Sequence, residues 1–285
     1  MDRDRTHVRV HGDPGVEHPV VVIAFEGWND AGDAATSALR HLEELWHGEA
    51  FATIDPEEFH DFNVTRPSVE FGPDGRRRIV WPTSTFSVCR SAPVEIVTLS
   101  GIEPQMRWRR FAEEIVGTVR SLDASMVLTL GALLADVPHS RPVVIYGASE
   151  DPDVRERLDM QASTYQGPTG IVGVLHAALR DAGIASASLW AAVPTYVPGA
   201  TSPKAALALV ERIGRLLEVD VTTRDLLEET REYDAEVSAL VAEDDETADF
   251  VAELERRYDA GDHVEMDDPG RLVEEVERFL RDMRE

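Results

Sequence analysis

The stretch His18-Pro-Val-Val-Val-Ile-Ala-Phe-Glu-Gly-Trp-Asn-Asp-Ala-Gly-Asp-Ala-Ala-Thr-Ser-Ala-Leu-Arg-His-Leu42 predicts a strand, a short polar turn and a helix in immediate succession. Residues 20–25 form an unbroken apolar run, mostly β-branched, which is typical of a strand buried on both faces of a parallel sheet. From residue 34 onward, apolar side chains recur at helical spacing. The rest of the chain is arranged around this strand–turn–helix unit.

The turn between the two elements carries the first candidate binding residues, Glu26, Trp28, Asn29 and Asp30. In open α/β sheets, ligands bind at the carboxyl ends of the strands, which is where this turn lies. Two glycines in the turn let the backbone bend tightly. The carboxylates are suited to acid or base chemistry in a cleft, but Asp30 could equally cap the helix that follows.

Strand-like and helix-like segments alternate through the first 224 residues. Buried-type strands are expected at 94–99, 126–130, 143–146 and 187–192, and amphipathic helices at 105–122, 170–182 and 203–219. This alternation predicts an α/β fold with a mostly parallel central sheet flanked by helices. Residues 1–224 are therefore assigned to one α/β core domain.

Residues 69–81 predict a β-hairpin outside this pattern. Asp74-Gly75 supplies residues that tolerate the positive φ of a tight turn, and Arg76, Arg77 and Arg78 follow directly. Two interpretations remain open. The hairpin is either a solvated arm whose charges discourage edge pairing, or an arm that contacts the acidic surface of a partner subunit.

The last 61 residues differ from the rest in charge. Residues 225–285 contain 23 acidic and 7 basic side chains, so they carry −16 of the chain's net −26. Apolar residues at alternating spacings of three and four predict amphipathic helices at 226–240, 247–258 and 269–285. We interpret 225–285 as a separate acidic α-helical C-terminal region.

A second candidate binding segment comprises Tyr165, Gln166, Gly167 and Thr169. It opens a predicted helix, and the free backbone N–H groups of a helix N-terminus can hold an anion. The other interpretation is that its glycines permit a tight turn and close packing of the helix on the sheet. We expect this segment to line one cleft together with residues 28–30.

Composition narrows the classes of function. A net charge of −26 argues against binding to nucleic acid or to an anionic membrane. No apolar run approaches the ~20 residues that span a bilayer. No apolar signal region follows the N-terminus, so a cytoplasmic protein is expected. Cys89 is the only cysteine, which precludes an intrachain disulfide.

Motifs for catalysis and for cofactors are missing from the sequence. It contains no Gly-x-Ser-x-Gly elbow and neither of the glycine-rich nucleotide fingerprints. His41 and Glu44 share a predicted helical face, but two ligands do not make a metal site. We therefore assign no catalytic residue, no metal and no cofactor, and enzymatic activity is the less expected alternative.

Four motifs resemble, in order, those of the proteasome assembly chaperone 2 family. They are Phe25-Glu-Gly-Trp-Asn-Asp-Ala-Gly-Asp-Ala-Ala35, Thr129-Leu-Gly-Ala-Leu-Leu-Ala-Asp-Val-Pro-His139, Tyr165-Gln-Gly-Pro-Thr-Gly-Ile171 and Trp190-Ala-Ala-Val-Pro-Thr-Tyr-Val-Pro-Gly199. The chain is most similar to the long bacterial members with an acidic helical C-terminal extension. The resemblance implies a fold related to nucleoside phosphorylases and a protein that self-associates, with a trimer slightly favoured over a dimer.

Two functions follow from these features. The first, implied by the resemblance, is a non-catalytic, homo-oligomeric assembly chaperone or scaffold with a protein client. The alternative is an enzyme or binding protein for a small phosphate-bearing or nucleoside-like ligand at the strand-end cleft, by analogy of fold. Some proteasome-binding members of the family end in a hydrophobic–Tyr–any-residue tail. This chain ends Phe279-Leu-Arg-Asp-Met-Arg-Glu285, so docking through such a tail is not expected.

Overall fold

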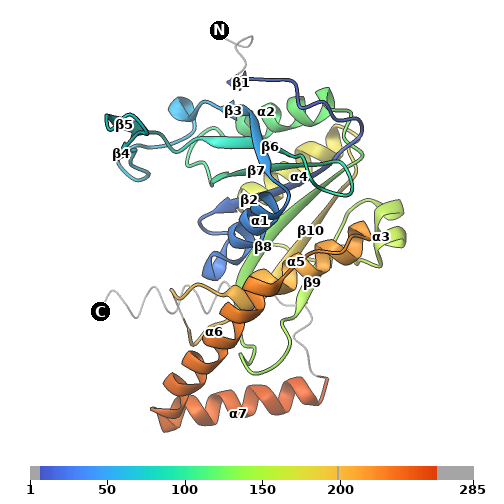
Figure 1. Cartoon of the computed structure of the whole chain (residues 1–285). Helices are drawn as coiled ribbons and strands as arrows, with labels where there is room; N and C mark the ends of the chain where they lie inside the picture. The colour runs from blue at the N-terminus through green and yellow to red at the C-terminus, as the bar shows by residue number, and fades with distance from the viewer. Residues whose placement is uncertain (1–6, 198, 262–285) are drawn as a thin grey trace.

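A mixed eight-stranded sheet forms the centre of the protein (Figure 1). The computed structural model describes residues 7–197 and 199–261. The strands lie in the order β1-β3-β6-β7-β2-β8-β10-β9. Their bounds are β1 (Val8–Val10), β2 (Val20–Glu26), β3 (Gly48–Ile54), β6 (Ser84–Cys89), β7 (Ile96–Ile102), β8 (Met126–Ala135), β9 (Ile145–Ala148) and β10 (Ser186–Pro194). The strands β7, β2, β8 and β10 run parallel, and those on either side pair antiparallel.

This parallel centre confirms the predicted α/β fold. β2 lies within it, hydrogen-bonded to β7 on one side and to β8 on the other. Residues 21–25 of β2 are all buried. Because helices cover both faces of such a sheet, the sequence of a central strand is continuously apolar and does not alternate with polar residues.

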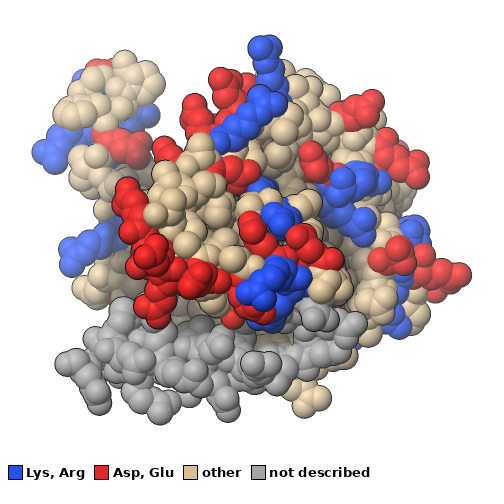
Figure 2. Space-filling view, turned by 90° about the horizontal axis from the view of Figure 1, so that it is seen from below, with Lys and Arg blue, Asp and Glu red and all other residues tan. Residues whose placement is uncertain are grey.

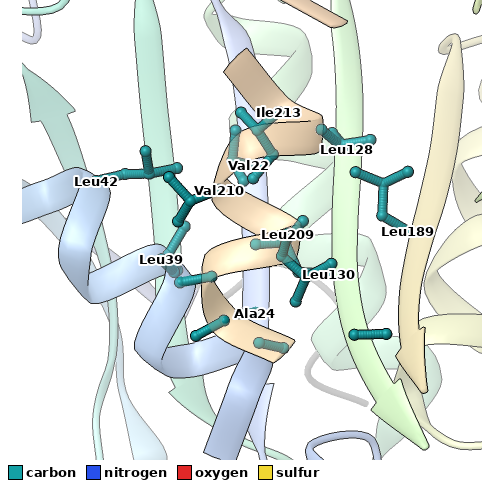
Figure 3. Close-up of a cluster of buried hydrophobic side chains, with 14 of the residues drawn as sticks. Val22, Ala24, Leu39, Leu42, Leu128, Leu130, Leu189, Leu209, Val210 and Ile213 are labelled. Atoms are coloured by element: carbon teal, nitrogen blue, oxygen red, sulfur yellow. The ribbon is translucent and has the colours of Figure 1, made fainter. Parts of the chain in front are cut away.

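Helices cover the sheet in two layers, each with its own apolar cluster. α1 (Ala34–Leu45), which follows the short 3-10 turn η1 (Ala31–Asp33), packs with α5 (Pro203–Leu217) on one face. α2 (Trp108–Ser121) and α4 (Ile171–Asp181) pack on the other. Alternate side chains of β2 enter the two layers. Val22 and Ala24 lie among residues of α1 and α5 (Figure 3), whereas Ile23 and Phe25 lie among those of α2 and α4.

Three parts of the core differ from the prediction. β8 continues to Ala135, beyond the expected end at residue 130, because its second half pairs with β10. β9 is a half-buried antiparallel edge strand, whereas a buried strand was expected at 143–146. The helix α3 (Pro152–Leu158) was not expected, although Asp151 caps it and proline opens it. Its seven residues are too few for a periodic apolar pattern to emerge.

The hairpin is confirmed as a separate two-stranded sheet of β4 (Ser68–Phe71) and β5 (Arg77–Val80). It projects from the body of the protein (Figure 1), beyond the short turn η2 (Pro56–Glu58). Every residue of its two strands is exposed. Phe62 and Trp81 pack at its base, with ring centroids 4.9 Å apart. Residues 68–81 are called the hairpin arm below.

The described part of the acidic C-terminal region consists of α6 (Arg224–Ala242) and α7 (Asp245–Asp259). α6 packs against α5, and its Leu226 belongs to the apolar cluster around α1 and α5. Lys204 of α5 lies 3.0 Å from Asp234 of α6. The third expected helix, at 269–285, and the end of the chain lie outside the described residues. These contacts attach α6 to the core, and the division at residue 225 stays a prediction.

Acidic side chains outnumber basic ones in this protein. Asp and Glu number 54 against 28 Lys and Arg, and carboxylates are spread over the face in Figure 2, the end of the molecule at which α7 lies. In the described part of the chain, no helix combines the length and the apolar composition needed to cross a membrane.

Candidate functional site at the carboxyl edge of the parallel strands

The turn after β2 places Trp28 on the surface and the next two side chains inside the fold. The Asp30 N–H donates to the Gly27 carbonyl at 3.0 Å, which closes a four-residue turn. Gly27 has φ 119°, a conformation that favours glycine. Trp28 is 63% exposed, whereas Asn29 and Asp30 are buried. Asp30 rejoins the sheet through a parallel bridge to Ala132, so both ends of the turn are anchored.

Asp30 satisfies the start of helix α1. Its Oδ1 accepts the Ala35 N–H at 2.6 Å, and its Oδ2 accepts the Thr36 N–H at 3.3 Å and the Thr36 hydroxyl. The carboxylate therefore lies at the positive end of the helix dipole. Burial raises the pKa of Asp30 above its ordinary value, and the hydrogen bonds from Thr36 and Ala35 oppose that shift. Of the two roles that the sequence left open, these contacts are those of a cap.

Glu103 joins the turn after β2 to the start of α4. Its Oε1 accepts from Asn29 Nδ2 at 2.8 Å and from the Ile171 backbone N–H at 2.8 Å. Its own backbone N–H donates to the Glu26 carbonyl at 2.9 Å. Sequence reasoning missed Glu103 because no motif marks it. The sequence feature that could have indicated Glu103 is its position directly after β7. Because β7 runs parallel to β2, Glu103 and the turn after β2 lie at the same edge of the sheet.

Gly170 lets α4 begin directly against Asn29. A Cβ at position 170 would lie 2.5 Å from Asn29 Oδ1 and 2.7 Å from Glu103 Oε1, closer than side chains tolerate. Asn29 Oδ1 is buried and has no hydrogen-bond partner among the described residues. Asn29 of the first predicted segment therefore lies beside Gly170, the residue that follows the second segment.

Six predicted site residues are exposed, namely Glu26, Trp28, Tyr165, Gln166, Gly167 and Thr169. The Tyr165 hydroxyl donates to the Pro168 carbonyl at 2.6 Å, which folds the segment back on itself. In the described part of the chain, no ring contact joins Trp28 to Tyr165. The structure thus brings Asn29 to the end of the second segment, and a cleft shared by the whole set stays a prediction.

The helices α1, α4 and α5 all begin at this edge. Ser202 caps α5 by accepting the Ala205 N–H at 3.3 Å. The Ser202 backbone N–H donates to the Gly32 carbonyl at 2.7 Å, which fixes the start of α5 beside that of α1. A carboxylate at a helix N-terminus typically stabilises the folded protein by about 0.3–1 kcal/mol. Asp30 and Glu103 are therefore placed as partners of helix starts.

A surface hollow of about 410 Å³ lies at the other end of α5. Its lining comes from the last turns of that helix and from the segment that leads to α6, namely Glu211, Gly214, Arg215, Glu218, Val219, Asp220, Val221 and Thr223. None of the predicted site residues lines it. The hollow is therefore separate from the strand-end edge.

A second polar network lies where α6 covers the loop after β8. The His139 backbone N–H donates to the Tyr196 hydroxyl at 2.6 Å, and His139 Nε2 lies 3.0 Å from the Ser238 hydroxyl of α6. Burial lowers the pKa of His139 and raises the pKa of Tyr196 to about 12. Arg141 makes two 2.8 Å hydrogen bonds to Asp259 at the end of α7. This network fastens both C-terminal helices to the core.

The fold and the strand-end motifs are those of one protein family. The model of the PAC2 family matches residues 24–241. A PAC2 family protein from Streptomyces avermitilis is 45% identical, with a TM-score of 0.77 over 82% of this chain and 99% of that one. The chain belongs to the PAC2 family, as the four motifs predicted.

Further solved structures extend the comparison. A proteasome-assembly chaperone homologue from Mycobacterium tuberculosis is 42% identical, with a TM-score of 0.73 over 81% of this chain and 99% of that one. An archaeal proteasome activator from Pyrococcus furiosus shares the fold at 14% identity, with a TM-score of 0.66 over 82% and 97% of the two chains. No curated protein matches the chain.

Proposed function

We propose that this PAC2-family protein is a non-catalytic, homo-oligomeric assembly chaperone or scaffold that binds a protein client in the cytoplasm. A relative at 42% identity is described as a proteasome-assembly chaperone homologue, which supports a protein as the binding partner. Self-association, with a trimer slightly favoured over a dimer, is part of the proposal. So is the lack of a catalysed reaction.

One observation carries the proposal: Trp28 is exposed at an edge where the buried Asp30 and the half-buried Glu103 are already engaged. Asp30 is bonded to the start of α1, and Glu103 to Asn29 and the start of α4. A substrate at this edge would find the Asp30 and Glu103 carboxylates already bonded to helix starts. A protein surface would meet an indole that is 63% exposed and held on a rigid turn. Tryptophan is enriched among the residues that dominate protein–protein binding energy.

The alternative is a small phosphate-bearing or nucleoside-like ligand at the start of α4. It is favoured by the buried Asn29 Oδ1, which has no partner among the described residues. However, the Glu103 carboxylate lies 2.8 Å from the Ile171 N–H, the position that a phosphate would need. A phosphate there would experience like-charge repulsion, so we rank this function second.

The experiment is a reconstitution of proteasome assembly from purified subunits of the source organism, followed on native gels. Wild-type protein should raise the yield of assembled particles and should comigrate with an assembly intermediate. Trp28→Ala should lose most of both effects. If wild-type protein neither changes the yield nor comigrates, and phosphate or a nucleoside raises its thermal midpoint instead, the alternative replaces the proposal.

A further inference from the structure

We infer that the hairpin arm docks on the acidic outer surface of α6 in a second copy of this chain. The inference rests on the self-association in the proposed function and assigns the surfaces that form it. The arm is a two-stranded sheet separate from the central one. A hairpin of this kind is at best marginally stable in water unless it packs on something else. We therefore expect the arm to pack against a further protein surface.

One face of the arm is apolar and exposed. In the register of its strands, Val69 lies opposite Ile79, and Phe71 lies two residues further along the same face. Val69 is 48% exposed, Ile79 is 53% exposed and Phe71 is 77% exposed. Arg77 is the residue opposite Phe71, so a cation borders the apolar face. The other face carries Ser68, Glu70, Arg78 and Val80.

The arm is a basic segment on an acidic protein. The hairpin arm contains three arginines and two carboxylates, a net charge of +1 on a chain of −26. Arg78 pairs with Asp74 inside the arm at 3.3 Å. Arg76 and Arg77 have no ion-pair partner within the described residues. A second copy of this chain offers the opposite charge.

α6 presents a surface of matching chemistry. Residues 224–259, which span α6 and α7, contain 14 carboxylates and 4 arginines. Leu240 of α6 is 61% exposed. Glu236 and Glu243 flank it at helical spacings of four and three residues. Neither carboxylate has an ion-pair partner among the residues that the structure describes. On α6, an exposed apolar side chain thus lies between carboxylates that have no ion-pair partner among the described residues. The arm has the complementary arrangement, with exposed apolar side chains beside arginines that have no such partner.

The arm and α6 lie at separate places on the molecule (Figure 1). A contact between them therefore joins two different surfaces. Two copies can exchange it reciprocally about a two-fold axis, and three or more copies can repeat it head-to-tail. Head-to-tail contacts close into rings when the rotation between subunits permits. A ring of three arms and three α6 surfaces leaves no arm unpaired, which agrees with the trimer of the proposed function.

The test uses full-length variants in size-exclusion chromatography with light scattering at micromolar concentration. Arg77→Glu places like charges in contact and should weaken self-association about tenfold or more. The double variant Arg77→Glu/Glu236→Arg restores opposite charges and should regain the wild-type mass. Phe71→Ser should also dissociate the oligomer. The control Val10→Ser removes a side chain of β1 that is 70% exposed and should change nothing.

Each outcome supports or overturns the inference. Dissociation by both arm variants with rescue by the double variant supports it. An oligomer that survives Arg77→Glu and Phe71→Ser overturns it and leaves the proposed self-association intact. A monomeric wild-type protein overturns both. Dissociation without rescue overturns the assignment of α6 as the surface that receives the arm.

Discussion

Asn29 Nδ2 donates to Glu103 Oε1 at 2.8 Å across 74 positions of sequence. The bond joins the carboxyl ends of the neighbouring strands β2 and β7, and the same oxygen accepts the first N–H of α4. One carboxylate thus accepts from a buried amide N–H and from a helix start. The turn that presents Trp28 is therefore a fixed part of the fold, and this rigidity is what the proposed partner site depends on.

Glu103→Ala should destabilise the fold by about 1–3 kcal/mol, because it leaves the buried Asn29 amide and the Ile171 N–H without their acceptor. Urea unfolding measures the change. Glu113→Ala, at an exposed position on α2, is the control and should stay within about 0.5 kcal/mol of wild type. Equal stability of the two variants would mean that Glu103 does not hold the turn.

Asp30→Asn should alter how stability depends on pH. Burial raises the folded pKa of Asp30, so between its ordinary value of 3.8 and that raised value the folded state binds more protons than the unfolded state. Asp30 therefore contributes more stability below pH 3.8, and this contribution is lost as pH rises through the folded pKa.

The measurement for Asp30 is urea unfolding of both proteins from pH 7 downward. The free energy of unfolding of wild type should rise relative to Asp30→Asn as the pH falls toward 4. All other titrating groups are common to the two proteins and cancel in the difference. A difference that shrinks on acidification would show that the hydrogen bonds to the carboxylate outweigh its burial.

The central strands and the large helices could be predicted because the buried sides of regular elements give recognisable patterns of apolar residues in the sequence. β2 has a continuous apolar run, and α5 has both a Ser202 cap and an apolar stripe. β9 differs from the predicted buried strand because it lies at the edge of the sheet, where its residues are only half-buried. Local patterns report how a segment is buried, and they do not report which segment covers it.

The candidate site was predicted only in part for the same reason. The turn at residues 26–30 was recognised from its place after a buried strand. Glu103 makes its decisive contacts with residues 74 and 68 positions away, and such pairs leave no mark on a single sequence. The network of His139, Tyr196 and Ser238 could not be predicted either, because it joins the loops after β8 and β10 to α6 across 57 and 99 positions of sequence.

Trp28→Ala should weaken self-association or client binding while changing the stability of the core by less than about 1 kcal/mol, because the side chain is 63% exposed. The thermal midpoint and the oligomer distribution of the same sample test both parts. Val94→Ala, which is 37% exposed on the segment before β7, is the control. A variant that unfolds would make Trp28 a core residue, and one that changes neither property would remove the turn from the site.

Deletion of residues 225–285 should leave a folded core that melts cooperatively at a lower temperature. The cost comes from Leu226, which is buried in the cluster around α1 and α5, and from the Lys204–Asp234 ion pair. Leu226→Ala in the full chain should cost about 2–4 kcal/mol and so measures the first of these losses. An insoluble product, or one without a thermal transition, would show that α6 is part of the core domain.

The mass of the wild-type protein in solution tests the central claim most directly. Light scattering on the size-exclusion peak at micromolar concentration should give a mass near three times the 31.6 kDa of one chain. A peak of 31.6 kDa that persists as the concentration is raised would contradict the account.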